Sequence, residues 1–166
     1  MTRYGMAIDL KRCFGCHACE VACKVANNLP ADLAYNRVMT VGGDSFDTAA
    51  GEFPNCTLSF LPMQCQHCET PACFAVCPTG ATQKDEKTGI VTVDGETCIG
   101  CGSCIQACPY QGVRTLIGDD PDYYLDVVVG EADAPAHKPS TVEKCTFCKL
   151  SLIHISEPTR RSYISY

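Results

Sequence analysis

Fourteen of the 15 cysteines in this 166-residue chain fall into four short motifs with regular spacing. The first motif is Cys13, Cys16, Cys19 and Cys23, and the second is Cys65, Cys68, Cys73 and Cys77. The third is Cys98, Cys101, Cys104 and Cys108, and the fourth is the pair Cys145 and Cys148. Cysteines at this density form disulfides or bind zinc or iron–sulfur clusters. The chemistry of the chain therefore depends on which of these the four motifs support.

Composition argues against several classes of protein. The cysteine number is odd, and the N-terminal residues lack the apolar core of a secretory signal, so a disulfide framework is disfavoured. No apolar run reaches the length of a membrane-spanning helix. The formal net charge of −6 provides no basic surface for nucleic acid.

Cysteine spacing separates the two remaining metal chemistries. Three cysteines at i, i+3 and i+6 let one short loop reach three corners of a [4Fe–4S] cubane, and the fourth cysteine of such a motif ligates the neighbouring cluster. Gly15, Gly100 and Gly102 fall where such a loop must turn tightly. Zinc sites also use C-x2-C pairs, but a longer loop usually separates the pairs. The spacing favours iron–sulfur clusters and keeps a non-redox zinc-binding structural module as the alternative from another class.

Residues 3–149 resemble the iron–sulfur electron-transfer subunits of the dimethyl sulfoxide reductase (molybdopterin oxidoreductase) family. The stretches that carry the resemblance are YGMAIDLKRCFGCHACEVACK, QCQHCETPACFAVCPTGA, CIGCGSCIQACPY and KCTFCK. The four-residue gap in CETPAC is the most specific of these features. The resemblance implies an α+β, ferredoxin-like iron–sulfur protein with two pseudo-symmetric two-cluster halves, short helices and β-hairpins.

The resemblance also implies which cysteines share a [4Fe–4S] cluster. One cluster would be held by Cys65, Cys68, Cys73 and Cys108, and a second by Cys98, Cys101, Cys104 and Cys77. The resemblance implies two further, outer clusters. Cys13, Cys16 and Cys19 would hold one of them, and Cys23, Cys145 and Cys148 the other. Each of these sets lacks its fourth ligand. Two of the four clusters expected in the intact protein are therefore fully ligated in this chain, with iron bound through these cysteines.

The last 17 residues, 150–166, contain no cysteine and interrupt the fourth motif. Their beginning, LSLIHISEPTR, resembles the in-frame translation of a transposon-based sequencing adapter. We therefore interpret residues 1–149 as the ferredoxin-like domain, truncated within its fourth motif, with an inner two-cluster module at about 56–117. Residues 150–166 are interpreted as adapter read-through and not as a native domain.

The residue pattern predicts several local elements. Residues 81–84 and 90–93 predict a hairpin around a turn at 85–89. Further strands are expected at 4–8, 57–61 and 123–129, and a helix at 16–26 with Val21 and Val25 facing inward. His17 and His67 are expected to face solvent, and Cys56, which lies outside all motifs, to be a buried apolar side chain.

Charge placement suggests a difference between the motifs. The bases beside the first and fourth motifs are Lys11, Arg12, Lys24, Lys144 and Lys149. Nearby cations favour the more negative, reduced state of a cluster. We hypothesise that the outer clusters have higher reduction potentials than the inner ones.

The sequence contains no nucleotide-binding glycine loop and no identifiable nucleophile with its base, so we predict no catalytic residues. The resemblance implies a subunit that relays single electrons between a membrane quinol-linked subunit and a molybdopterin catalytic subunit in anaerobic respiration. An integral membrane anchor subunit would be the other partner. The alternative within electron transfer is the same role in a formate dehydrogenase or hydrogenase complex. The chain would be cytoplasmic, or carried across the membrane by a partner, in a peripheral membrane complex.

Overall fold

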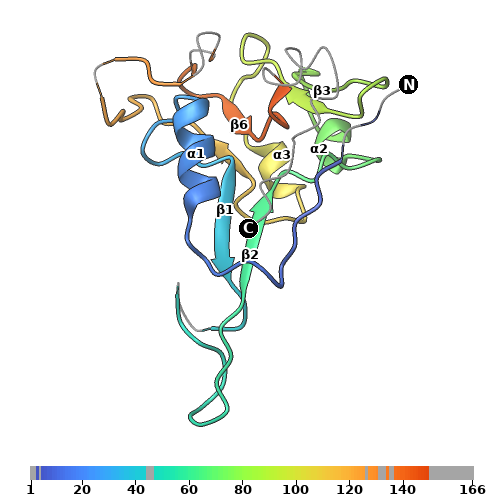
Figure 1. The fold of residues 1–166 in the computed structure, drawn as a ribbon. Coiled ribbons are helices and arrows are strands. Elements are labelled where there is room, and N and C mark those ends of the chain that lie inside the picture. The colour runs from blue at the N-terminus through green and yellow to red at the C-terminus, as the bar shows by residue number, and fades with distance from the viewer. Residues whose placement is uncertain are drawn as a thin grey trace, which may run out of the picture.

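The computed structural model describes residues 3, 5–43, 47–125, 127–130, 134 and 137–149. The helices are α1 (Ala18–Ala26), α2 (Ala72–Ala75) and α3 (Ser103–Gln106). The strands are β1 (Asn36–Thr40), β2 (Phe60–Gln64), β3 (Thr82–Lys84), β4 (Val91–Val93), β5 (Arg114–Leu116) and β6 (Val142–Lys144). In this described part the strands pair as three two-stranded antiparallel sheets, so short helices and β-hairpins dominate the fold (Figure 1).

The hairpin predicted at 81–93 is confirmed by β3 and β4. Thr82 lies opposite Val93 in the antiparallel register. The Asp85 N–H donates to the Ile90 carbonyl at 2.9 Å, and the Gly89 N–H donates to the Asp85 carbonyl at 2.8 Å. Gly89 has a φ of +77°, which glycine adopts readily, so the sequence at the turn suits its backbone.

A second antiparallel pair, β5 with β6, joins segments that are far apart in the sequence. Arg114 lies opposite Lys144, and Leu116 lies opposite Val142. Strand β6 also lies beside β4, and Val142 packs in one core with Val91. This pairing places the residues just before the fourth cysteine motif beside those that follow the third motif.

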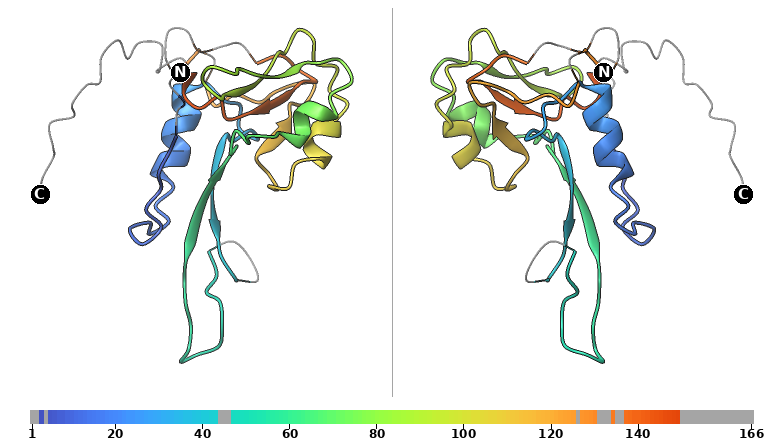
Figure 2. Two further views of the ribbon diagram at one scale, coloured as in Figure 1. Left: turned by 90° about the vertical axis from the view of Figure 1, so that its right-hand side faces the viewer. Right: turned by 90° about the vertical axis from the view of Figure 1, so that its left-hand side faces the viewer.

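The third pair, β1 with β2, continues outward as a long arm (Figures 1 and 2). Asn36 lies opposite Gln64 and Thr40 opposite Phe60, and an isolated bridge joins Ala50 to Thr57 farther out. The strand predicted at 57–61 is therefore displaced, because β2 begins at Phe60 and runs on to Gln64.

Two predicted strands are wrong. Described residues 5–8 form no strand, and Tyr4 lies outside the described residues. Described residues 123–125 and 127–129 also form no strand, and the side chains of Tyr124 and Val128 are exposed. β-Branched and aromatic residues favour a strand only where a partner strand is present to pair with it. Among the described residues, neither run pairs with another strand.

Helix α1 begins at Ala18, two residues after the predicted start, and its orientation differs from the prediction. Val21 and Val25 are 58% and 48% exposed, so they do not face inward. The helix instead meets β1 through Glu20, whose carboxylate accepts the Val38 N–H at 3.2 Å. Hydrophobic spacing cannot reveal this polar contact, which lies on the face of α1 that meets β1.

The core of the described chain consists of two small clusters, and both contain motif cysteines. One is formed by Leu29, Leu33, Tyr35, Cys65, Ile117 and Cys145, with Cys23 packed against it. The other is formed by Cys73, Val91, Cys104 and Val142, with Cys98 and Ile105 packed against it. The cysteine loops therefore form part of the core. Among the described helices, none is long and apolar enough to cross a membrane.

Candidate functional site

All four cysteine motifs share one backbone feature. The residue immediately before the second cysteine has a positive φ in each: Gly15 at +72°, His67 at +44°, Gly100 at +65° and Phe147 at +60°. This left-handed conformation is easy for glycine and strained for histidine and phenylalanine. The same tight turn thus occurs four times, twice in residues for which it is unfavourable.

Four predicted ligands from two different motifs line one cavity. They are Cys77 of the second motif and Cys98, Cys101 and Cys104 of the third. The Thr82 N–H donates to the Cys77 sulfur at 3.5 Å, and the Val142 N–H donates to the Cys98 sulfur at 3.5 Å. Backbone donors of β3 and β6 therefore face the sulfurs, as required where thiolates carry negative charge.

The Cys77 and Cys101 thiols are shifted toward the deprotonated form. Partial burial raises the pKa of Cys77, but hydrogen bonds from Thr82 and Thr79 outweigh it and lower the pKa to about 7. A hydrogen bond with Ser103 lowers the pKa of Cys101. Metal ligation needs the thiolate, so these shifts favour ligand function.

The second complete set gathers around Cys73. Burial raises the pKa of this thiol, and the Cys65 and Cys108 thiolates lie near enough to raise it further. The guanidinium of Arg114 opposes them, and its Nη2 donates to the Cys73 sulfur at 2.9 Å. The remaining predicted ligand of this set, Cys68, is half-buried in the same loop as Cys65.

The fourth motif approaches the last cysteine of the first. The pKa of Cys23 is raised to about 12, chiefly by burial and then by nearby Cys145, Cys148 and Cys19. The Phe147 N–H donates to the Cys145 sulfur at 3.3 Å. Cys145 and Cys148 thus lie near enough to Cys23 to raise its pKa, and these three are the set expected for one outer site.

The cysteines of the first motif are less enclosed. Cys16 and Cys19 are exposed, and Cys13 is half-buried. They flank the start of α1, where His17 has a left-handed backbone (φ 57°). His17 is itself half-buried, and its Nδ1 lies 3.1 Å from the Glu20 carboxylate, so its predicted solvent-facing position is wrong.

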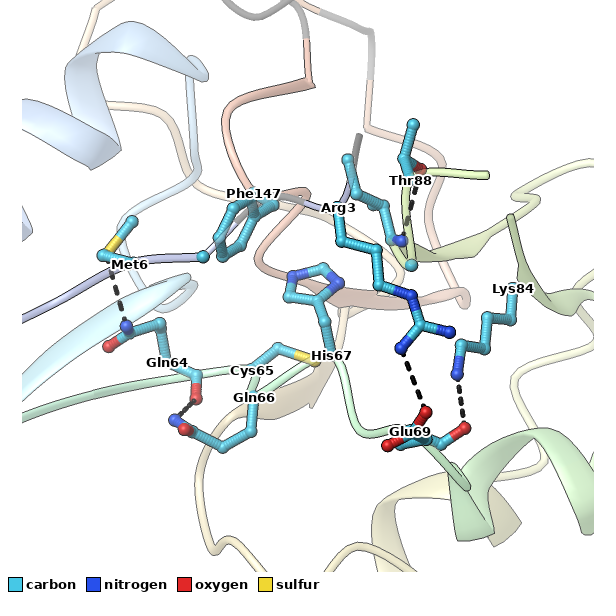
Figure 3. Close-up of a pocket in the computed structure, with 13 residues that line it drawn as sticks. Arg3, Met6, Gln64, Cys65, Gln66, His67, Glu69, Lys84, Thr88 and Phe147 are labelled. Carbon is cyan, nitrogen blue, oxygen red and sulfur yellow. Dashed lines mark hydrogen bonds and ion pairs between the residues drawn. The ribbon is translucent and has the colours of Figure 1, made fainter. Parts of the chain in front are cut away.

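His67 also does not face solvent. Its Nδ1 accepts the Val91 N–H at 3.0 Å, and its ring meets the Phe147 ring edge to face with centroids 5.0 Å apart. Both rings line a pocket to which Cys65 and Arg3 also contribute (Figure 3). Burial, with Lys144 and Arg114 nearby, lowers the pKa of His67 to about 3, so the ring is neutral. His67 therefore links the loop of the second motif to β4 and to the fourth motif.

Two buried cations lie among the cysteines, and sequence reasoning did not anticipate their burial. Arg114 and Lys144 are each 3% exposed and lie opposite each other on β5 and β6. Lys144 donates from Nζ to the carbonyls of Val91 and Cys145. No local sequence signal distinguishes these bases from exposed ones, because the pairing of β5 with β6 buries them.

These positions remove part of the basis for higher outer potentials, and the hypothesis itself stays a prediction. Lys144, which the sequence assigns to the fourth motif, also lies near Cys65 and Cys73 of the inner set. The side chain of Arg12, beside the first motif, is 89% exposed, and exposed charges act weakly. Buried Arg114 thus lies at the inner motifs, and buried Lys144 lies between an inner set and the fourth motif.

All 15 cysteines are free in this structure. Cys56 is exposed, so its predicted burial is wrong; the arm that carries it extends away from the core. Among the described residues, no group of three or more His, Cys, Asp or Glu side chains is close enough to share a single metal ion.

The buried polar atoms near the cysteines fit a cluster with sulfur acceptors. Arg114 Nη1 and His67 Nε2 are buried and have no hydrogen-bond partner among the described residues. A buried N–H without an acceptor is unfavourable. Arg114 Nη2 donates to the Cys73 sulfur, so Nη1 is the atom that lacks an acceptor. The inorganic sulfides of a [4Fe–4S] cluster are acceptors of the kind that Nη1 lacks.

Comparison with known families agrees with this donor set. Residues 56–117 and residues 90–150 each match a 4Fe-4S dicluster domain. Residues 10–26 match a 4Fe-4S binding domain. The three matches together include all four cysteine motifs.

Named relatives specify the family further. The chain is 41% identical over 154 residues to a protein of Halobacterium salinarum named as an iron–sulfur subunit of dimethyl sulfoxide reductase, covering 89% of this chain and 57% of the relative. It is 49% identical over 111 residues to a selenate reductase subunit of Mesobacillus selenatarsenatis, covering 67% of this chain and 35% of the relative. It is 43% identical over 159 residues to a polypeptide of the anaerobic dimethyl sulfoxide reductase of Escherichia coli, covering 94% of this chain and 76% of the relative.

The chain belongs to the family of iron–sulfur electron-transfer subunits typified by the one in dimethyl sulfoxide reductase. Its cofactors are [4Fe–4S] clusters. The chain spans 57% and 35% of the lengths of the first two relatives.

Proposed function

We propose that this chain relays single electrons between a membrane quinol-linked subunit and a molybdopterin catalytic subunit. When bound, its [4Fe–4S] clusters supply one-electron transfer. The family membership and the cysteine loops of the core support this role. The observation that carries the proposal most directly is the cavity lined by Cys77 together with Cys98, Cys101 and Cys104.

The cysteines of the two inner sites cross between motifs in this proposal. Cys65, Cys68, Cys73 and Cys108 hold one cluster, and Cys98, Cys101, Cys104 and Cys77 hold the other. The closeness of Cys73 to Cys65 and Cys108 supports the first set. The shared cavity supports the second.

The outer sites are incomplete in the same scheme. Cys23 joins Cys145 and Cys148, a set that their mutual electrostatic effect supports. Cys13, Cys16 and Cys19 form the remaining three-ligand set, which their spacing supports. The turn repeated in all four motifs is consistent with two related two-cluster halves.

The protein's own side chains and backbone hold the ligands and insulate them. Backbone N–H groups of Thr82, Val142 and Phe147 donate to cysteine sulfurs. Hydrogen bonds to sulfur stabilise the more negative, reduced state and so raise the potential. The small apolar cores around Cys65 and Cys104 exclude water from the ligands.

We also propose that the chain works in a peripheral membrane complex with a catalytic subunit and a membrane anchor. The names of the relatives, which are subunits of reductases, support a catalytic partner. Residues 150–166 remain, in our interpretation, adapter read-through that follows a domain of residues 1–149, and they lie outside the described residues.

Anaerobic purification tests the proposed function. We expect brown protein with acid-labile sulfide, and after reduction an electron paramagnetic resonance (EPR) signal of reduced [4Fe–4S] clusters. Membranes containing a quinol and the anchor subunit should reduce these clusters. Colourless protein that retains zinc after reconstitution with iron and sulfide would instead support the zinc-binding alternative.

A further inference from the structure

Arg114 is a buried cation without a carboxylate partner. It is 3% exposed on β5, and among the described residues no Asp or Glu pairs with it. A buried, unpaired charge is strongly unfavourable in a protein interior. Negative charge must therefore compensate Arg114 from another source.

The contacts of Arg114 point to cysteine sulfur as that source. Its Nη2 donates to the Cys73 sulfur at 2.9 Å. The same guanidinium lies near enough to Cys104 to oppose the rise that burial causes in the pKa of that thiol. Its Nη1 is buried without a partner. Cys73 and Cys104 belong to the two different inner ligand sets, so one guanidinium reaches both.

Lys144 provides an internal comparison. It lies opposite Arg114 in the strand register and is equally buried, but its Nζ donates to two backbone carbonyls. Arg114 donates to sulfur instead. The planar guanidinium, with five donors in a fixed fork, can serve two acceptors in different directions, and it stays charged at all working pH values.

We propose that Arg114 is a positioning residue that acts as the shared cation of the two inner clusters and raises the reduction potential of both. This inference rests on the proposed function. Each reduction adds one electron, and hence one negative charge, to a cluster, while Arg114 neither gains nor loses a proton. A fixed cation that is hydrogen-bonded to a ligand of one cluster and lies near a ligand of the other stabilises that added charge at both sites.

The experiment is a dithionite titration of the full chain, purified anaerobically and followed by EPR. Arg114→Met removes the charge and keeps a long side chain, and Arg114→Lys keeps the charge. Arg12→Met is the control, because the Arg12 side chain is 89% exposed. Iron and sulfide are measured for each variant before titration.

We expect Arg114→Met to lower the equilibrium constant for one-electron reduction of both inner clusters at least about tenfold, which corresponds to about 59 mV. Arg114→Lys should stay within about threefold of the wild type, since the charge remains. Arg12→Met should shift neither cluster.

Three results would overturn the shared-cation proposal. The first is an Arg114→Met protein with full iron and unchanged potentials. The second is a shift confined to one cluster. The third is an equal shift in Arg114→Lys, which would exclude charge as the cause.

If Arg114→Met does not assemble, Arg114→Gln, which is also neutral but can still donate to Cys73, is titrated in its place. Loss of iron in both neutral variants, with iron retained in Arg114→Lys, would assign Arg114 to assembly and overturn the tuning role. Absence of any cluster signal in the wild type would defeat the proposed function itself, which is a separate outcome.

Discussion

The inner and first cysteine motifs have similar spacing but different surroundings. Three of the eight inner cysteines, Cys65, Cys73 and Cys104, are buried, whereas no cysteine of the first motif is. The two buried bases Arg114 and Lys144 also lie near the inner sets, whereas Arg12, one of the bases beside the first motif, is exposed. Similar ligand patterns can thus lie in regions of very different dielectric and charge, which spacing alone does not reveal.

The difference has a structural origin. The inner motifs are followed by the β3–β4 hairpin and by β5, and β6 packs beside β4 and pairs with β5. The first motif runs into α1, which contains Cys19 and Cys23 and in which no residue is buried. Strand pairing encloses the inner loops, and a single helix beside β1 leaves the first loop accessible.

Replacement of a cysteine should have the largest effect, and the iron content of the variants should distinguish the inner motifs from the first motif. We expect about eight irons per wild-type chain, from two clusters with four irons each. Cys104→Ala removes an inner ligand and should reduce the iron to about four, whereas Cys16→Ala should leave about eight. The measurement is iron and acid-labile sulfide per chain after anaerobic reconstitution.

Cys56→Ala is the control for this pair, because Cys56 is exposed on the arm and lies in no motif. Equal iron loss from Cys104→Ala and Cys16→Ala would contradict the distinction between complete inner and incomplete outer sites.

Gly100→Ala should test how closely the inner loops are packed. A methyl group at Gly100 would meet the Ser140 carbonyl oxygen at 2.2 Å, whereas one at Gly102 would meet nothing within 4 Å. The φ values are similar, +65° and +73°, so backbone strain is matched. Overpacking should therefore destabilise Gly100→Ala by about 1–3 kcal/mol more than Gly102→Ala.

Chemical denaturation of the two iron-loaded variants, in parallel, measures this difference in free energy of unfolding. Equal stabilities would mean that the loop of the third motif can move away from Ser140, and that the inner region is less tightly enclosed than its packing implies.

Tyr35→Phe should test the connection between the region around α1 and β6. Tyr35 is 2% exposed, and its hydroxyl donates to the Glu143 carboxylate at 2.6 Å. Hydrogen bonds to charged groups contribute about 1.5–3 kcal/mol, so the variant should lose about that much stability.

The matched control is Tyr110→Phe, since Tyr110 is partly exposed at 37% and no hydrogen bond of its hydroxyl is found among the described residues. The thermal midpoint of unfolding is compared for both variants. A Tyr35→Phe midpoint no lower than that of Tyr110→Phe would show that the two regions are held together by other contacts.

The smallest expected effect concerns acid stability of the inner hairpin. Hydrogen bonds from the Lys87 N–H and then the Thr88 hydroxyl lower the pKa of Asp85 below its ordinary value of 3.8. Because the folded pKa is depressed, this stabilisation is present above the ordinary pKa and is lost as the pH falls through the folded pKa. Asp85→Asn should therefore flatten the decline of stability below about pH 4.

The midpoint of urea denaturation between about pH 3 and pH 7, with Glu86→Gln as the charge-matched control, checks this expectation. An unchanged acid profile in Asp85→Asn would mean that the hairpin turn does not respond to this carboxylate.

Local signals in the sequence predicted local features of the structure. The β3–β4 hairpin was predicted because alternating apolar residues flank a turn with Asp85 and Gly89, whose interactions are all within a few residues. The tight turns at Gly15 and Gly100 were also predicted, since glycine tolerates positive φ. The strands predicted at 4–8 and 123–129 failed because a strand depends on a partner that composition does not name.

The sequence by itself determined the main lines of this protein's chemistry, because the types and spacing of 14 cysteines favour iron–sulfur clusters over zinc, which the family matches bear out. The tertiary structure alone decided which charges act on those cysteines. Arg114 and Lys144 look like ordinary bases in the sequence, and pairing of β5 with β6 buries both beside the inner motifs. Electrostatic strength depends on burial and distance, which arise when segments remote in the sequence pack together.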